Sequence, residues 1–211
     1  MLVRQRTQSV NHLRAFALEL GLVAPKSRAS LMRLVPEWLE DGDNGLSESA
    51  RALLWAMYEQ LRGLEDLIAG VDDRLKLEAT KHPACARLQT MRGVGPVIAT
   101  GLVAALGDGS AFRNGRAVGA WLGLVPGHEA SGESYKETGI TKQGNPELRA
   151  LLVHGARSAI NSLGDRSDPV SEWARRLLER SPRNKATVAL ANKMARMMWA
   201  MLRHEQNYRY A

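Results

Sequence analysis

Cysteine is almost absent from this sequence of 211 residues, because Cys85 is its single cysteine. A disulfide bond or a multi-cysteine metal site within one chain is therefore excluded, and the composition fits a reducing cytoplasm. No apolar run approaches the roughly 18 residues of a membrane-spanning helix. The first residues, MLVRQRTQSV, also lack the apolar centre of a signal peptide. We therefore expect a cytoplasmic protein without a membrane partner.

Motifs for metal or nucleotide chemistry are missing as well. The sequence has no HExxH motif, no CxxC pair and no phosphate-binding P-loop. Its five histidines never stand four residues apart, so no two of them share one helical face as metal ligands. Asp108, Glu129 and Glu133 are too few to form the carboxylate cluster of a two-metal nuclease. We expect no metal site in this chain.

Charge is distributed unevenly along the chain, whose formal net charge is +7. Residues 1–36 contain six Lys or Arg and one acid, whereas residues 37–78 contain four basic and eleven acidic residues. Residues 79–211 contain nineteen basic and ten acidic residues. Basic ends around an acidic middle favour a polyanionic partner, most often nucleic acid. The alternative is that the excess charge serves solubility alone.

The N-terminal part of the sequence predicts two helices. Residues 2–20 have apolar residues at helical spacing, and Gly21 suits the C-terminal cap. A loop containing Pro25, Pro36 and the sequence DGDNG is expected to follow. Residues 47–81 form a long helix with seven apolar residues at alternating spacings of three and four between 54 and 75. This heptad pattern predicts either a coiled-coil seam of a homo-oligomer or a helix packed on the first helix of the same chain.

The segment 86–106 has the pattern of a helix-hairpin-helix. A short apolar helix is expected to end near Met91, Gly93 and Gly95 form a tight turn, and Pro96 opens a second helix. In such hairpins the glycines let backbone N–H groups approach a DNA phosphate, a contact that does not depend on base sequence. The alternative is an ordinary helical hairpin with glycine at its bend.

The rest of the chain predicts helices at about 115–122, 168–181 and 183–206, and another that begins after Asn145. Asn114 and Asn145 are the expected N-terminal caps of the first and last of these, respectively. Strand signals are nearly absent, apart from short extended pieces at the flanks of the loop 124–140. The sequence therefore predicts an all-α fold, with a helical or coiled-coil region at 1–82 and a second helical domain at 83–211.

A polar stretch, HEASGESYKETGITKQGN, precedes the helix after Asn145. Ser131 in this stretch is a candidate nucleophile, with three nearby bases to neutralise a phosphoryl group: Lys136, Lys142 and Arg149. Backbone N–H groups around Gly139, Gly144 and the following helix start would add to this anion site. From this feature alone, however, a loop serine beside a glycine is far more often a turn residue.

Four segments together resemble one known family. They are LVRQRTQSVNHLRAFALELGLVAP, MRGVGPVIATGLVAALGDGSAFRNGRAVGAWLGLVP, SGESYKETGITKQGNPELRALLVHGARSA and NKATVALANKMARMMWAML. In this order they resemble the C-terminal two-thirds of transposases of the IS110 insertion-sequence family, including its IS1111 branch.

The resemblance implies more than the residues do. Members of the family join a RuvC-like domain, which carries four metal-binding acids, to a C-terminal domain whose serine forms a phosphoserine link to DNA. A structured bridge RNA encoded by the element guides them to target and donor DNA. The family's serine corresponds to Ser131, and its basic, glycine-containing segment corresponds to Gly139, Lys142, Gly144 and Asn145. A bacterial, nucleoid-associated location is implied too.

Two functions remain open at this point. The first is the serine-bearing, DNA-binding part of a transposase, which would require Mg²⁺ only in combination with a RuvC-like domain, since those four acids are absent from this sequence. On this interpretation the chain alone is not a competent recombinase. The second is a non-catalytic nucleic-acid-binding or regulatory protein that acts through mixed oligomers. A helical scaffold that binds no nucleic acid is the third, plainest alternative.

Overall fold

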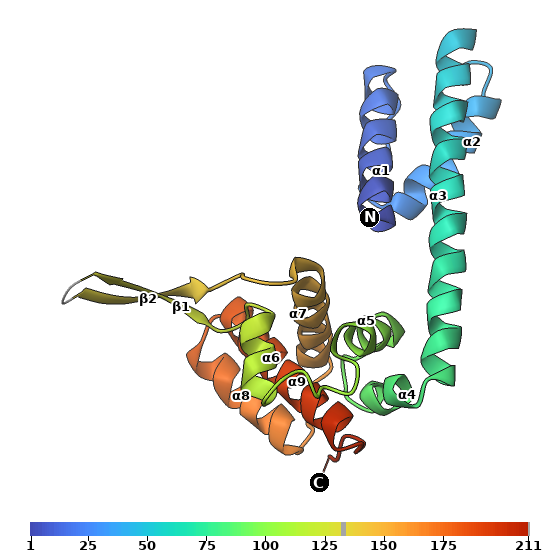
Figure 1. The fold of residues 1–211 in the computed structure, drawn as a ribbon. Helices are drawn as coiled ribbons and strands as arrows, with labels where there is room; N and C mark the ends of the chain where they lie inside the picture. The colour runs from blue at the N-terminus through green and yellow to red at the C-terminus, as the bar shows by residue number, and fades with distance from the viewer. Residues whose placement is uncertain (132–133, 211) are drawn as a thin grey trace. The chain divides into compact units, whose positions relative to one another are not determined.

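A computed structural model describes residues 1–131 and 134–210, which contain nine helices and one two-stranded sheet (Figure 1). The all-α class predicted from the sequence is confirmed. The chain divides into two compact units, Met1–Arg74 and Leu75–Ala211. None of the helices in the described ranges is long and apolar enough to cross a membrane.

The first unit contains α1 (Leu2–Glu19), α2 (Arg28–Glu40) and most of α3 (Glu48–Lys81). Helix α1 ends as the sequence predicts, with Gly21 in the left-handed conformation at φ +80°. The Gly21 and Leu22 N–H groups donate to the carbonyls of Leu18 and Ala17, which is the Schellman arrangement. The core of this unit joins all three helices through Val10, Leu13, Ala17, Leu31, Val35, Leu54 and Leu61.

Helix α2 corrects the sequence analysis, which expected a loop in this region. Ser27 caps the helix by accepting a hydrogen bond of 3.1 Å from the Ser30 N–H. Pro36 lies inside the helix although it has no N–H to donate, a defect that costs about 3 kcal/mol in a helix interior. Leu31 and Val35 are fully buried on the same helix. Burial of two aliphatic side chains is worth about 3–6 kcal/mol, enough to offset the proline.

The heptad positions of α3 differ in their environment. Leu54 and Leu61 are completely buried in the core that α1 and α2 share with this helix. This part of the pattern is therefore used for packing within the chain, the second of the two interpretations above. Farther along, the side chain of Val71 is 37% exposed. Pairing of α3 with a second copy of the chain stays a prediction.

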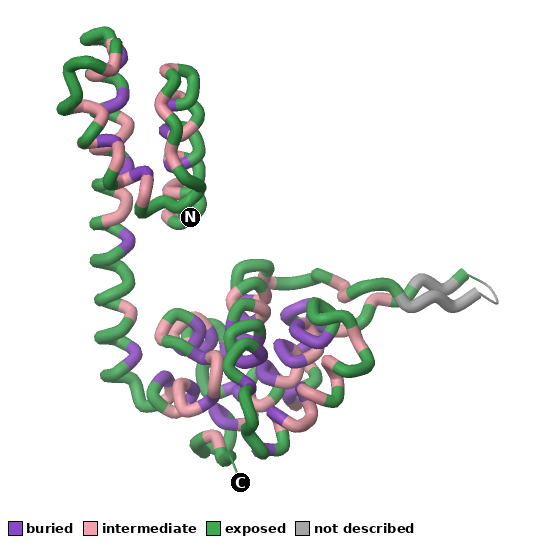
Figure 2. The backbone as a smooth tube through the Cα atoms, turned by 180° about the vertical axis from the view of Figure 1, so that it is seen from behind, coloured by how far each residue is buried: buried purple, intermediate pink, exposed green. Residues whose placement is uncertain are grey.

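The second unit is built around its last helix, α9. Buried residues of α4, α5, α6, α7, α8 and α9 form one continuous core (Figure 2). The helices of this unit are α4 (Pro83–Gln89), α5 (Pro96–Leu106), α6 (Gly115–Trp121), α7 (Pro146–Asn161), α8 (Pro169–Arg180) and α9 (Arg183–Arg203). Asn114 and Asn145 cap α6 and α7 as predicted, each through its side-chain oxygen.

A β-hairpin projects from the second unit between α6 and α7 (Figure 1). Its strands, β1 (Pro126–Ser131) and β2 (Ser134–Ile140), are antiparallel. Pro126 pairs with Ile140 near the helices, and Ser131 pairs with Ser134 at the far end. The sequence indicated only short extended pieces here, because the strands carry many polar residues and no clean alternation of apolar side chains.

Candidate DNA-contacting site

Ser131 is the last residue of β1 and is exposed to solvent. Its position at the far end of the hairpin separates it from the helical core of the second unit (Figure 1). Gly132, which follows it, lies outside the described residues. An exposed hydroxyl on a projecting element is sterically accessible to a large substrate such as DNA, which a serine within the helical core would not be.

The base of the hairpin is fixed by two glycines. Gly123 and Gly144 have φ angles of +66° and +78°, and a side chain at either position would collide with backbone. At Gly144 the collision would be with the Trp121 carbonyl, and at Gly123 with the backbone of Gln143. The Thr141 and Lys142 N–H groups donate to the carbonyls of Val125 and Gly123 at 3.0 and 3.2 Å. Glycine is therefore required here for close packing, not only for an approach to phosphate.

Arg149 and Asn145 are both used within the chain. The Arg149 guanidinium donates from Nη1 to the carbonyls of Leu122 and Gln143 at 2.9 and 3.0 Å. Asn145 Oδ1 accepts from the N–H groups of Glu147 and Leu148, both at 3.0 Å. Arg149 thus joins the end of α6 to the loop before α7, and Asn145 starts α7. In the structure, both residues therefore stabilise the base of the hairpin.

Three other predicted contact residues belong to the hairpin or its base. Lys142 is exposed and has a φ angle of +55°, which is uncommon for a residue with a side chain. Gly139 is exposed, and a Cβ added to it would meet nothing within 4 Å. Lys136 pairs with Glu129 in the strand register, but its side chain lies outside the described part of the structure.

The structure does not bring Ser131 together with Lys142 and Arg149. Five residue-to-residue steps of extended chain lead from Pro126 at the hairpin base to Ser131, and a strand rises about 3.3 Å per residue. The serine is therefore roughly 17 Å from the base, where Lys142 and Arg149 lie. Neighbours in sequence become opposite ends of a hairpin, so these two bases do not surround the serine within one chain.

The α4–α5 turn contains the other pair of predicted contact glycines. Gly93 has a φ angle of +79°, and its backbone packs so closely on Gly155 of α7 that a side chain on either would collide with the other. Gly95 is exposed, has open space around it and precedes Pro96, the first residue of α5. Gly93 therefore attaches the turn to α7, and Gly95 is the glycine that faces solvent.

A polar cluster beside this turn was not anticipated from the sequence. Arg92 lies 3.6 Å from Asp168 Oδ2, donates to the Ser171 hydroxyl at 3.2 Å and stacks over the Tyr210 ring. Burial alone would raise the pKa of Asp168, but hydrogen bonds from Ser171 and the charge of Arg92 outweigh it and lower the pKa. Seventy-nine residues separate Arg92 from Ser171, so no local pattern identified the contact.

A metal site is not formed by the described residues. Among them, no three His, Cys, Asp or Glu side chains gather closely enough to hold an ion. The family resemblance assigns the metal-binding acids to a RuvC-like domain, so the described residues do not test the magnesium that it implies.

Comparison with known proteins adds to this geometry. Residues 85–170 match the profile of the transposase family described as IS116/IS110/IS902. The chain is 37% identical over 209 residues to a probable family 20 transposase of Pseudomonas aeruginosa, which covers 99% of this chain and 62% of that protein. It is 35% identical over 208 residues to the transposase for insertion sequence element IS1111A of Coxiella burnetii, covering 99% and 57%. Over residues 85–170 the chain is similar to the IS116/IS110/IS902 transposase family.

The part of the chain that matches the transposase profile includes the candidate site. Residues 85–170 run from α4 through the hairpin and α7 to the beginning of α8, so they contain Ser131, Arg149 and the α4–α5 turn. A further relative, the transposase for insertion sequence element IS1328 of Yersinia enterocolitica, is 34% identical over 202 residues. The chain spans between 57% and 62% of the length of these three relatives.

Proposed function

We propose that the chain is the DNA-binding, serine-bearing part of a transposase, and that Ser131 is its nucleophile. The observation that carries the proposal is the exposed serine at the far end of a projecting hairpin, inside the segment that matches the transposase family. Arg149, Gly123 and Gly144 fix the base of this hairpin, and the hairpin places the serine away from the helical body.

The proposed reaction is a transesterification. The Ser131 Oγ attacks the phosphorus of a DNA phosphodiester, an Oγ–P bond forms, and one P–O bond to deoxyribose breaks. The serine hydroxyl proton ends on the departing deoxyribose oxygen, so the phosphoserine link conserves the energy of the ester without an oxidant or reductant. Charge on the phosphoryl oxygens must be neutralised during this step. Because Lys142 and Arg149 lie at the other end of the hairpin, that neutralisation would come from groups other than these two.

The proposed assembly contains two further partners. A second copy of the chain would pair through the 54–75 heptad helix, at heptad positions that are not buried within the chain, such as Val71, which is 37% exposed. A structured guide RNA, which the family resemblance implies, would direct the choice of DNA. Sedimentation of the purified chain tests the first partner. A single species with the mass of one chain, 23.2 kDa, at micromolar concentration would contradict it.

The serine is tested by substitution in a plasmid transposition assay in which this chain is combined with a RuvC-like domain. Ser131→Ala is expected to reduce transposition by more than about 100-fold and to abolish covalent protein–DNA adducts on denaturing gels. Ser158→Ala, at an exposed serine of α7, is the matched control and is expected to retain both. If Ser131→Ala still forms adducts, the serine assignment is wrong. If neither the unsubstituted protein nor the Ser131→Ala variant forms adducts, yet both bind DNA, the non-catalytic regulatory function is favoured.

A further inference from the structure

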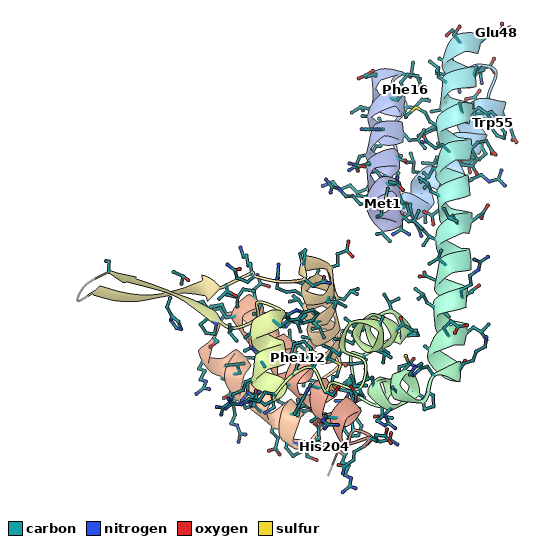
Figure 3. All side chains as sticks on the ribbon, in the orientation of Figure 1. Met1, Phe16, Glu48, Trp55, Phe112 and His204 are labelled. Carbon is teal, nitrogen blue, oxygen red and sulfur yellow. The ribbon has the colours of Figure 1, made fainter. Side chains whose placement is uncertain are left out.

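An open groove of about 590 Å³ lies between the beginning of α6 and the outer face of α9. We call it the α6–α9 groove, and Asn114, Arg116, Lys193, Arg196 and Trp199 are the lining residues that matter below. In Figure 3 the labels Phe112 and His204 mark residues just before α6 and just after α9. The groove lies outside the hairpin and the α4–α5 turn, and the function proposed above does not use it.

Tight packing of two helices places the basic residues of the groove side by side. A Cβ added at Gly115 would lie 2.9 Å from the Arg196 carbonyl oxygen, and one at Gly119 would lie 3.1 Å from Asn192 Oδ1. Asn192 also donates from Nδ2 to the Leu124 carbonyl at 2.9 Å. The two glycines, one helical turn apart, therefore let α6 lie directly on α9. This contact fixes Arg116 next to Arg196 on rigid elements.

The charge of the groove is not neutralised within the described residues. Arg116 and Arg196 are exposed, and neither they nor Lys193 forms an ion pair with a carboxylate there. Helix α9 carries five Lys or Arg and no Asp or Glu over its 21 residues. Burial and the neighbouring charge of Arg196 both lower the pKa of Lys193. Three crowded cations without a counter-charge favour a polyanion as their partner.

The polar and aromatic groups of the groove select among polyanions. The Trp199 Nε1–H donates to the Gly109 carbonyl at 2.9 Å, and the Trp173 ring lies under Lys193 Nζ at 4.5 Å. The Lys193 ammonium therefore covers one face of the Trp173 ring, and that face is not free to stack an unpaired base. Asn114 Oδ1 accepts from the Ala117 N–H as the cap of α6 and is thus engaged within the chain. Contacts to the phosphates of a duplex remain, and these need only cations.

We propose that the α6–α9 groove binds the phosphate backbone of duplex DNA through Arg116, Lys193 and Arg196. The proposal rests on the nucleic-acid-binding part of the function above and assigns it a surface. Arg116 and Arg196 present forked guanidinium groups, which suit phosphate oxygens, and Lys193 adds a point charge between the helices. The contact positions DNA without reading its base sequence.

The test compares two triple variants that lose the same charge. In the groove variant, Arg116→Gln, Lys193→Gln and Arg196→Gln remove three unpaired cations. In the control variant, Arg33→Gln, Arg62→Gln and Lys81→Gln remove three cations that each pair with a neighbouring Glu. Binding of two fluorescent DNA duplexes of unrelated sequence, and of one RNA duplex, is measured by anisotropy over a series of KCl concentrations. Each phosphate contact contributes about 0.9 to the slope of log K against log salt.

The groove variant is expected to lower that slope by about 2–3 for both duplexes, while the control variant leaves it nearly unchanged. Equal slopes in the two variants would overturn the proposal. A loss that appears only with an RNA duplex would overturn the assignment to DNA. If the triple variant does not fold, the single variants Arg116→Gln and Arg196→Gln replace it, each with an expected decrease of about 0.9. Adducts at Ser131 report the serine separately, so either proposal can fail alone.

Discussion

Two identical substitutions in helix interiors are expected to change stability in opposite directions. Gly155 is in α7 and Gly63 is in α3, and replacing glycine by alanine inside an ordinary helix gains about 0.8–1.0 kcal/mol. A Cβ at Gly63 would meet nothing within 4 Å. Gly63→Ala is therefore expected to stabilise the protein by roughly that amount.

At Gly155 the same methyl group has no room. Its Cβ would lie 2.8 Å from Ile98 Cδ1 and closer still to the Gly93 carbonyl oxygen, well under the 3.0 Å below which something must shift. Ile98 can change its rotamer, but the Gly93 carbonyl belongs to a turn fixed at φ +79°. Inserting a methylene into a well-packed core costs about 1–3 kcal/mol. Because the obstacle is backbone, we expect the upper end of that range and a net destabilisation of about 2 kcal/mol after the helical gain.

Urea unfolding followed by far-ultraviolet circular dichroism gives both values under one condition. The free energies of unfolding of the two variants should differ by about 3 kcal/mol, with Gly63→Ala above wild type and Gly155→Ala below it. A Gly155→Ala protein as stable as Gly63→Ala, with unchanged circular dichroism, would refute the close contact between Gly93 and α7. It would also remove the basis for describing the α4–α5 turn as attached to α7.

Two further predictions concern single residues. Arg149→Met is expected to lower the free energy of unfolding by about 1.5–3 kcal/mol, because the carbonyls of Leu122 and Gln143 lose a charged donor. Arg157→Met, at an exposed position of the same helix, is the control, and equal losses in urea unfolding would contradict this role. The lowered pKa of Asp168 means that its contribution to stability is present above the unfolded pKa of about 3.9 and is lost as the pH falls through the folded value. The stability difference between wild type and Asp168→Asn should thus narrow from pH 7 to pH 3, and a widening difference would show the opposite shift.

Local signals in the sequence predicted most helices. Asn114, Asn145 and Gly21 mark helix ends through hydrogen bonds to groups no more than five residues away. Such interactions are encoded by neighbours in sequence and need no tertiary contact. Helix α2 was missed because Pro36 is a strong local signal for a break. The burial of Leu31 and Val35 that overrides it depends on α1 and α3.

For the predicted contact residues, the sequence and the structure differ more than they do for the helices. The sequence pattern marks glycines and bases near Ser131, but it does not distinguish a glycine that faces phosphate from one that faces another backbone. Gly93 and Gly144 turn out to pack against Gly155 and Trp121, whereas Gly95 and Gly139 have open space around them. Arg149 likewise donates to two carbonyls of the hairpin base. Residues that pack within the chain and residues that are free to contact phosphate are of the same amino-acid types, so the sequence does not distinguish them.

The sequence by itself determined the helical class, the helix ends with side-chain caps and the family resemblance, because each depends on residue types at fixed spacing. Only the tertiary structure decided which cations remain unpaired. Arg92 finds Asp168 and Ser171 from far along the chain, while Arg116, Lys193 and Arg196 meet in the α6–α9 groove with no carboxylate among the described residues. The tertiary structure also placed Ser131 and Lys142 at opposite ends of a hairpin. Proximity in space follows from packing between segments that are distant in sequence. Ser131 and Lys142 are eleven residues apart in the sequence, and the distance between them is set only when the two strands of the hairpin pair.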